Sequence, residues 1–269
     1  MSNINKYHLV TVRPNIDTLG NVAFDPDDIL FDWTAFEVPR GGCAIRSLNI
    51  IMAGTNSAVA NGALQMDLYF ATSLNGVEPP SLGLTNAAPT LIATTACRNH
   101  IIAYNAVLGS EMEDSLDGLI GYNVLGKGAV TSATTMQSEQ LTVLKGDSSY
   151  VGDTVTSATT AGYQTIWIAG LAQGAYDFGT DVKVVGAKTD LATRAFNVTD
   201  DTDGDDVFGI SDEIIAFAAD GSSGQVIGNV TAVTNNLVTT DGVGFDGALA
   251  DDDEFSFRGP MIIKIGLEY

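Results

Sequence analysis

Residues 64–70 alternate strictly between apolar and polar side chains, and this pattern limits the fold of the chain more than any other feature. The apolar positions are Leu64, Met66, Leu68 and Phe70. A period of two residues predicts a strand with one face in a core and the other toward solvent. Residues 45–52 form a second apolar run, in which Arg46 and Asn49 are expected to face outward. A Gly- and Asn-rich loop joins the two runs, so we expect neighbouring antiparallel strands of one sheet in a sandwich core.

The composition is typical of a protein built from strands. Hydrophobic residues make up 45% of the 269 residues, only 17% are charged, and there are 29 glycines. The mixture of Leu, Glu, Lys, Arg and Ala that fills amphipathic helices is nearly absent. We therefore expect an all-β protein, with many short strands joined by turns rich in Gly, Asn, Asp and Ser.

The charge of the chain is strongly one-sided. It carries 33 acidic and 12 basic residues, which gives a formal net charge of −21. Binding to nucleic acid needs clusters of Lys and Arg for the phosphates, and none is present, so a nucleic-acid partner is not expected. The same argument excludes an anionic membrane surface as a partner.

The start of the sequence and its two cysteines bear on the expected compartment. Residues 1–6 lead directly into a strand-like segment without an apolar stretch, so we expect no signal peptide. No apolar run approaches the roughly 18 residues needed to cross a bilayer. We therefore expect synthesis in a cytoplasm.

Because Cys43 and Cys97 are the only cysteines, we expect two buried thiols rather than a disulfide framework.

Several further elements are expected from local pattern. Strands are predicted at residues 7–12, 91–96, 101–108, 119–125 and 165–169. Ser110–Asp117 begins like a capped helix with acidic residues in its first turn, which predicts a single helical turn. Residues 71–89 are expected to form a long loop, and loops of this length in compact domains are usually functional or interfacial.

The C-terminal third predicts a second, smaller unit. Short strands are expected there at residues 182–185, 195–198, 212–217, 225–233, 236–239 and 254–257. A spacing of about ten residues per strand suits a small barrel of five or six strands. Residues 260–269 are too apolar for a free tail and are expected to return to the first domain as a strand. We therefore predict a jelly-roll-like antiparallel β-sandwich, residues 1–180 plus 258–269, with an acidic β-barrel inserted at 181–257.

Two motifs that suggest ligand binding are better explained as turns. Gly242–Gly247 matches Gly-x-Gly-x-x-Gly, but no helix signal follows, and the acidic residues after it would repel a pyrophosphate. The acidic run Asp200–Asp206 suggests calcium, yet its spacing does not fit an EF-hand loop. A solvated hairpin turn is the favoured interpretation. If a metal binds, these residues or Asp251–Glu254 are where we expect it.

No catalytic, cofactor-binding or metal-ligating residue is assigned from the sequence. His8 and His100 are the only histidines, and both lie in strand-like contexts without a zinc-spaced partner. Trp33, Phe36 and Trp167 have the composition of a sugar-binding platform, but aromatic residues at strand spacing favour a place in the core. The sequence therefore predicts a protein that is not an enzyme and holds no cofactor.

Three segments resemble virion structural proteins of marine tailed bacteriophages. They are residues 30–41 (LFDWTAFEVPRG), 67–76 (DLYFATSLNG) and 166–179 (IWIAGLAQGAYDFG). The resemblance implies a capsid-associated protein located in the virion, such as a decoration or cement protein bound to the major capsid protein of the head shell. It also implies self-association, with a trimer favoured.

Two other functions stay open at this point. One is a tail, fibre or host-adsorption protein, in which the barrel would bind the receptor. The other is a carbohydrate-binding or calcium-dependent adhesive module. The location of the protein on head or tail separates the first from a decoration protein, and glycan or calcium binding would favour the second.

Overall fold

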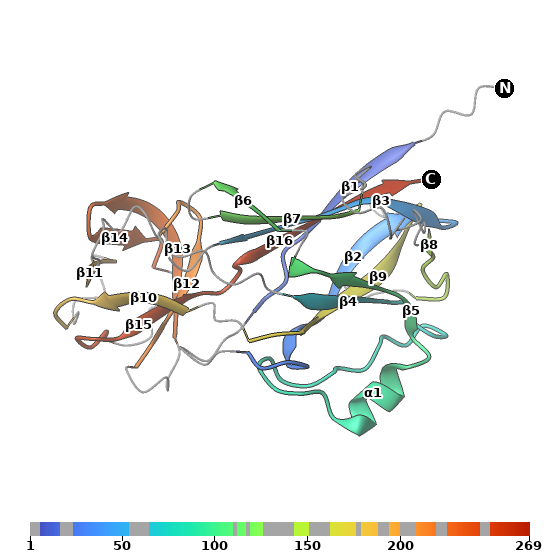
Figure 1. Ribbon diagram of the computed structural model, residues 1–269, viewed down its shortest axis with the longest axis horizontal. Coiled ribbons are helices and arrows are strands. Elements are labelled where there is room, and N and C mark those ends of the chain that lie inside the picture. The colour runs from blue at the N-terminus through green and yellow to red at the C-terminus, as the bar shows by residue number, and fades with distance from the viewer. Residues whose placement is uncertain are drawn as a thin grey trace.

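The computed structural model describes residues 6–16, 24–53, 65–109, 112–116, 119–125, 143–150, 162–175, 179–187, 194–199, 208–218, 225–242 and 248–269. Within these residues almost all regular structure is β-strand, which confirms the predicted all-β class. Figure 1 shows two facing sheets at one end of the molecule and a ring of strands at the other. We call these two parts the sandwich and the barrel.

The first sheet of the sandwich places the last strand of the chain between the first and third. Its order is β1 (Tyr7–Val12), β16 (Met261–Glu268), β3 (Cys43–Ala53), β7 (Leu119–Leu125) and β6 (Met112–Leu116), with β8 (Val143–Leu144) also paired to β3. All of these pairs are antiparallel. Burial alternates along the whole of β16, so that one face of the strand points into the core.

The second sheet of the sandwich faces the first across a shared core. Its order is β2 (Ile29–Pro39), β9 (Tyr163–Ala172), β4 (Met66–Ala71) and β5 (Ile101–Val107). One hydrophobic cluster joins Leu48 and Ile50 of β3 with Leu68 and Phe70 of β4, and all four are fully buried. Burial of each such side chain stabilises the fold by about 1.5–3 kcal/mol, so this cluster holds the two sheets together.

β3 and β4 are not neighbours, so the predicted pairing of residues 45–52 with 64–70 is wrong. β3 pairs with β16 and β7, whereas β4 pairs with β9 and β5. The two strands meet instead through their side chains, from opposite sheets. Alternation in a sequence fixes which face of a strand is buried, but it does not specify the partner strand.

The remaining strands pair in a closed ring. The order around it is β10 (Gly179–Val184), β11 (Ala195–Thr199), β14 (Leu237–Thr240), β13 (Gln225–Thr234), β12 (Glu213–Phe217) and β15 (Glu254–Phe257), which pairs back to β10. Aromatic rings fill the interior: Phe255 stacks on Phe196 with ring centroids 5.0 Å apart and meets Phe208 edge-on at 5.9 Å. The chain leaves the sandwich after β9 and re-enters it at β16.

The strand predicted at residues 91–96 is wrong, because this segment forms α1 (Leu91–Cys97). The side chain of Thr90 accepts a hydrogen bond from the backbone N–H of Ala93 at 3.2 Å, which caps the first turn. Cys97 is the one buried residue of the helix. The β-branched residues of the segment favoured a strand locally, but the Thr90 cap and the absence of a strand partner favour the helix.

The helical turn predicted at Ser110–Asp117 is also wrong where the structure describes it, since residues 112–116 form β6. β6 pairs with β7, with Met112 opposite Tyr122 and Glu113 opposite Gly121. The ladder with β7 therefore overrides a weak N-cap signal. Among the described residues, no helix is long and apolar enough to cross a membrane.

Candidate functional site

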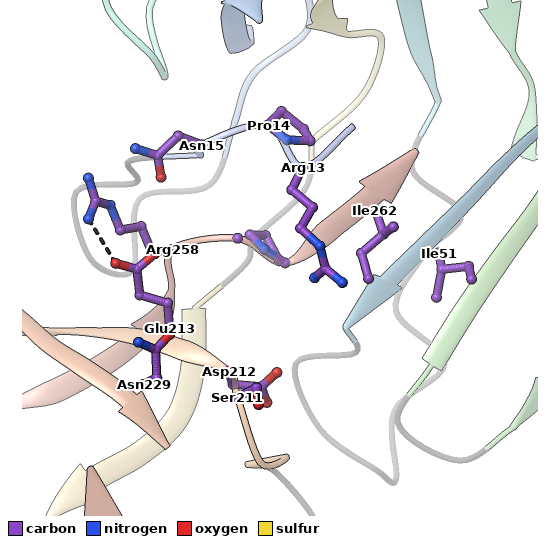
Figure 2. A pocket seen from close by; sticks show the side chains of 12 residues that line it. Arg13, Pro14, Asn15, Ile51, Ser211, Asp212, Glu213, Asn229, Arg258 and Ile262 are labelled. Carbon is purple, nitrogen blue, oxygen red and sulfur yellow. Dashed lines mark hydrogen bonds and ion pairs between the residues drawn. The ribbon is translucent and has the colours of Figure 1, made fainter. Parts of the chain in front are cut away.

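A cleft of about 450 Å³ lies where the sandwich meets the barrel. Its sandwich wall is formed by Arg13, Pro14 and Asn15 after β1, by Ile51 of β3 and by the segment entering β16; its barrel wall is formed by residues 211–213 and Asn229. Figure 2 shows Arg13 reaching into the space, with Ser211 and Asp212 on the opposite side. Arg13 on one wall and Ser211 on the other are 198 positions apart in the sequence.

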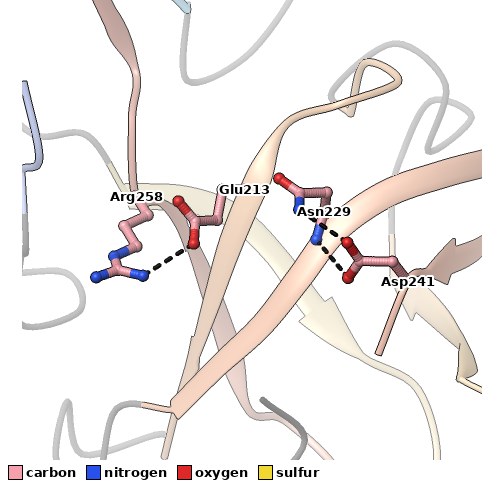
Figure 3. Close-up of polar contacts among 4 residues, drawn as sticks. All are labelled: Glu213, Asn229, Asp241 and Arg258. Carbon is pink, nitrogen blue, oxygen red and sulfur yellow. Dashed lines mark hydrogen bonds and ion pairs between the residues drawn. The ribbon is translucent and has the colours of Figure 1, made fainter. Parts of the chain in front are cut away.

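Arg258 joins the two lobes at the edge of this cleft. Its backbone N–H donates to the carbonyl of Glu213 at 2.8 Å, and its carbonyl accepts from the backbone N–H of Ile16 at 3.0 Å. Its guanidinium Nη1 also donates to Glu213 Oε1 at 2.9 Å (Figure 3). One residue therefore connects the end of β15, the start of β12 and the N-terminal segment of the sandwich.

Asn229 and Asp241 form a second polar contact next to the cleft. The backbone N–H and the side-chain amide of Asn229 donate to the two carboxylate oxygens of Asp241 at 3.0 and 2.8 Å (Figure 3). The backbone N–H of Asp241 donates in return to the carbonyl of Asn229 at 2.9 Å. This pair closes the end of the β13–β14 hairpin, so its polar groups have a structural role.

Asp212 and Arg13 give the cleft its remaining charge. Burial raises the pKa of the Asp212 carboxyl, and the hydrogen bond from the backbone N–H of Gly209, at 2.7 Å, partly offsets this effect. Arg13 is exposed on the sandwich wall. The cleft thus has opposite charges on its two walls and can hold a small polar group or water, while Arg258, Glu213 and Asn229 fix its shape.

The two histidines do not lie in this cleft. His100 is buried, and its Nδ1 lies 3.0 Å from the carbonyl oxygen of Thr72. Thr72 donates its backbone N–H to the carbonyl of His100 at 2.9 Å, so the histidine holds the long loop to the segment before β5. The ring of His8 packs against Tyr163, with centroids 5.5 Å apart. Both contacts are structural.

The acidic turn at Asp251–Glu254 is described by the structure, and two of its carboxylates accept hydrogen bonds from backbone N–H groups. Asp251 accepts from the backbone N–H of Gly186 at 2.7 Å, and Asp253 from that of Ala250 at 2.7 Å. In the described ranges no three His, Cys, Asp or Glu side chains lie close enough to hold a metal ion. The other acidic run, Asp200–Asp206, lies outside the described residues, as does most of Gly242–Gly247.

The candidate aromatic platform does not form on the surface. Trp167 is 4% exposed and meets Tyr150 edge-on at 4.9 Å, and Phe36 packs against Phe70 in the sandwich core. Trp33 is half-buried and donates its indole N–H to the carbonyl of Pro80 at 3.0 Å. These three side chains therefore stabilise the sandwich and the loop that covers it.

Both cysteines are buried and free, which confirms the expectation of two thiols. Burial raises the pKa of the Cys43 thiol to about 11. Burial also raises the pKa of Cys97, whose Sγ donates to the carbonyl of Pro80 at 2.8 Å. A thiol with a raised pKa is a poor nucleophile, so neither side chain has the character of a reactive cysteine.

Sequence reasoning missed an exposed aliphatic surface on the segment 79–97. Leu84, Leu91 and Ile92 are 81%, 81% and 83% exposed. We call these three side chains the loop–helix surface; they belong to the long loop and α1, which lie on the outer side of the second sheet (Figure 1). The available signal was the absence of any charged residue from Pro79 to Cys97 in so acidic a chain.

The segment that carries this surface is held firmly to the sheet. Asp32 Oδ1 accepts from the backbone N–H of Leu82 at 3.0 Å, and the carbonyl of Pro80 accepts from both Trp33 and Cys97. Leu82 and Cys97 pack with Ile29 and Ala169 in a small buried cluster. The exposed aliphatic side chains therefore project from a fixed base.

Comparisons with known proteins give no match: no protein-family model, curated protein or solved structure is significantly similar to this chain.

Proposed function

We propose that this protein is a non-enzymatic virion structural protein, a decoration protein seated on the head shell of a tailed bacteriophage. The observation that carries the proposal is the loop–helix surface. Solvent-exposed aliphatic groups on a rigid base are costly to keep in water, and surfaces rich in them mark sites of association. Leu84, Leu91 and Ile92 are each more than four-fifths exposed and lie within nine residues of one another in the sequence.

Charge supports the same surface as the point of attachment. The chain carries a net charge of −21, whereas residues 79–97 contain no charged side chain. A neutral aliphatic surface lets a strongly acidic protein approach a crowded lattice of neighbours without direct like-charge contacts at the interface. The major capsid protein, or another virion protein at the shell surface, is the proposed partner.

The proposed architecture is a jelly-roll-like sandwich, residues 1–180 plus 258–269, with an inserted barrel at 181–257. Support comes from the chain path, which leaves the sandwich after β9 and returns at β16. Each lobe also has its own hydrophobic cluster. In the assembled virion the sandwich sits on the shell through the loop–helix surface, the barrel extends outward, and copies associate as trimers.

Co-sedimentation with head shells tests the proposal. Shells assembled from the major capsid protein of the same phage are mixed with the protein, pelleted and assayed for bound copies. We expect the double variant Leu91→Ser/Ile92→Ser to lose most shell binding while its free energy of unfolding changes by no more than about 0.5 kcal/mol, because both side chains are exposed. Ile210→Ser is the matched control, since Ile210 is 73% exposed on the barrel side.

Two results would count against the proposal in different ways. If the wild-type protein stays in the supernatant with intact shells, the decoration function is rejected. If wild type and double variant sediment equally, attachment uses another surface and the loop–helix surface is wrongly assigned. A mass measurement that gives a monomer at micromolar concentration would reject the trimer.

A further inference from the structure

Two tyrosine rings lie side by side on the outer face of the second sheet. Tyr69 of β4 and Tyr104 of β5 are directly opposite in the register, and their rings stack with centroids 6.1 Å apart and planes inclined by 27°. β5 is the edge strand of this sheet, and Tyr104 is 65% exposed. We call the pair the tyrosine shelf. The Tyr104 ring is therefore accessible to solvent at the edge of the sheet.

Two carboxylates flank the shelf. Asp67 precedes Tyr69 by two residues on β4, so both side chains project from the same face. Asp27, whose backbone N–H donates to the carbonyl of Ala172, is close enough to raise the pKa of Asp67, although burial is the larger cause. Burial raises the pKa of Tyr69 too, with further contributions from Asp67, Tyr104 and Asp27. Asp27, Asp67, Tyr69 and Tyr104 therefore lie close enough to influence one another electrostatically.

The Asp67 carboxylate is half-buried, yet within the described part of the chain nothing donates a hydrogen bond to it or forms an ion pair with it. A half-buried carboxylate beside a second carboxylate opposes folding in its charged form. Its neighbour across the strand pair is Ala106, a neutral residue that offers no hydrogen-bond donor from its side chain. A charge that costs stability without a partner points to a ligand that supplies one.

The chemistry of the shelf selects an organic cation. Its negative potential and the net charge of the chain disfavour anions. A cation that lies on a tyrosine ring is attracted by the ring quadrupole, and a nearby carboxylate adds a charge-assisted hydrogen bond. A planar guanidinium satisfies both, because it stacks on the ring and presents several N–H donors at its edge.

We propose that the tyrosine shelf is a binding site for a guanidinium group, the cationic end of an arginine side chain on a partner molecule. The guanidinium lies on the exposed face of Tyr104 and donates to Asp67, while Asp27 strengthens the local field. This site shares no residue with the loop–helix surface, and its existence does not depend on attachment to a phage shell.

Binding of a small probe, followed by NMR of the tyrosine rings, tests the site. Nα-acetyl-arginine amide is titrated into full-length protein with ¹³C-labelled tyrosine in moderate salt, and the neutral isostere Nα-acetyl-citrulline amide serves as the ligand control. We expect saturable shifts of the Tyr69 and Tyr104 ring signals with the arginine compound alone. Tyr7, which is 70% exposed on β1, is the internal reference and should not shift.

Two variants and two matched controls assign the contacts. Tyr104→Ala should weaken probe binding about three- to tenfold, and Tyr7→Ala should not change it. Asp67→Asn should weaken binding about tenfold while leaving the melting temperature equal to or above that of the wild type, because an unpartnered charge has been removed. Asp252→Asn makes the same change of charge at an exposed turn of the barrel and should leave binding intact.

The proposal is overturned if the citrulline compound binds as well as the arginine compound, or if all exposed tyrosines shift together. Equal loss of binding in Asp67→Asn and Asp252→Asn would also overturn it, since that result means attraction to net charge alone. A lower melting temperature for Asp67→Asn would show that the carboxylate is a structural group. No ring shift at probe concentrations of about 50 mM would reject the site outright.

Discussion

Asp147 is the side chain that ties the long loop to the segment before β9. Its carboxylate accepts from the backbone N–H groups of Ser149 at 2.9 Å and Gly76 at 3.0 Å, and from the hydroxyls of Ser149 and Ser73. These donors lower its pKa from the ordinary value of 3.8 to about 2, with the Ser149 hydroxyl as the largest cause. The charged form is therefore the one that stabilises the fold.

Replacement of Asp147 by Asn should lower the free energy of unfolding at pH 7 by roughly 1 kcal/mol, a small value because the carboxylate is screened by solvent. A depressed pKa stabilises the folded state above the unfolded pKa and loses this effect as the pH falls toward 2. Urea titrations at pH 7, 4 and 2.5 should show the difference between variant and wild type shrinking with acid. A difference that is constant with pH would show that the charge is not the cause.

Local pattern in the sequence distinguished structural residues from reactive ones at several positions. The expectation that Cys43 and Cys97 are buried thiols is confirmed, because small apolar side chains in strand or helix patterns are usually core residues. The tyrosine shelf could not be found in this way. Tyr69 and Tyr104 are 35 positions apart, and only the strand register brings them together.

Gly170 in β9 has no room for a side chain. A Cβ atom at this position would lie 2.5 Å from Cε1 of the fully buried Phe31 ring, which belongs to the neighbouring strand β2. The register of β2 against β9 also shifts at Phe31, so the ring occupies the space above the glycine. The pairing of β2 with β9 thus depends on residue 170 being a glycine.

Gly170→Ala should lower the free energy of unfolding by about 1–3 kcal/mol, because the added methyl group overpacks the core against an aromatic ring that cannot move aside. Chemical denaturation followed by tryptophan fluorescence measures the change. Gly174→Ala is the matched control, since a Cβ there has no neighbour within 4 Å. Equal stabilities of the two variants would contradict the close packing of Phe31 on β9.

Individual strands could be predicted from their local sequence pattern. Short segments and strand pairings were missed, because they depend on contacts that the local pattern does not show. Strands were expected at 7–12 and 119–125 and are found with the same bounds as β1 and β7. The segment 91–96 was wrongly expected to be a strand, because its β-branched residues favour a strand locally, whereas the Thr90 side chain caps a helix in the structure. The pairing of β3 with β16 spans more than 200 residues, and no local signal encodes it.

The net charge of −21 acts on the molecule as a whole. Like charges repel one another in the compact state, and salt screens this repulsion because the Debye length falls from about 30 Å at 0.01 M to about 10 Å at 0.1 M. We expect the melting temperature to rise between 10 and 300 mM NaCl, by roughly 2–4 °C for each kcal/mol of repulsion relieved. The titration includes a chelator, so that calcium does not contribute. A melting temperature that falls with NaCl would contradict a net repulsive charge distribution.

At the scale of the whole molecule, the sequence indicated an all-β protein but did not show which surfaces could bind a partner. Spacing of short strands in the C-terminal third pointed to a separate group of strands, and the structure pairs them in a ring. Exposure of Leu84, Leu91 and Ile92 was missed, because apolar residues in a sequence favour burial by default and only the lack of charged residues in this segment pointed to it. The cleft beside Arg258 was also missed, since its walls come from distant parts of the chain.

Cryo-electron microscopy of intact phage particles tests the central claim most directly. The account predicts two-lobed density on the outer face of the head, with the sandwich toward the shell, residues 79–97 at the contact and the barrel pointing outward. Density for the protein on the tail or fibres, or a head contact made through the barrel, would contradict it.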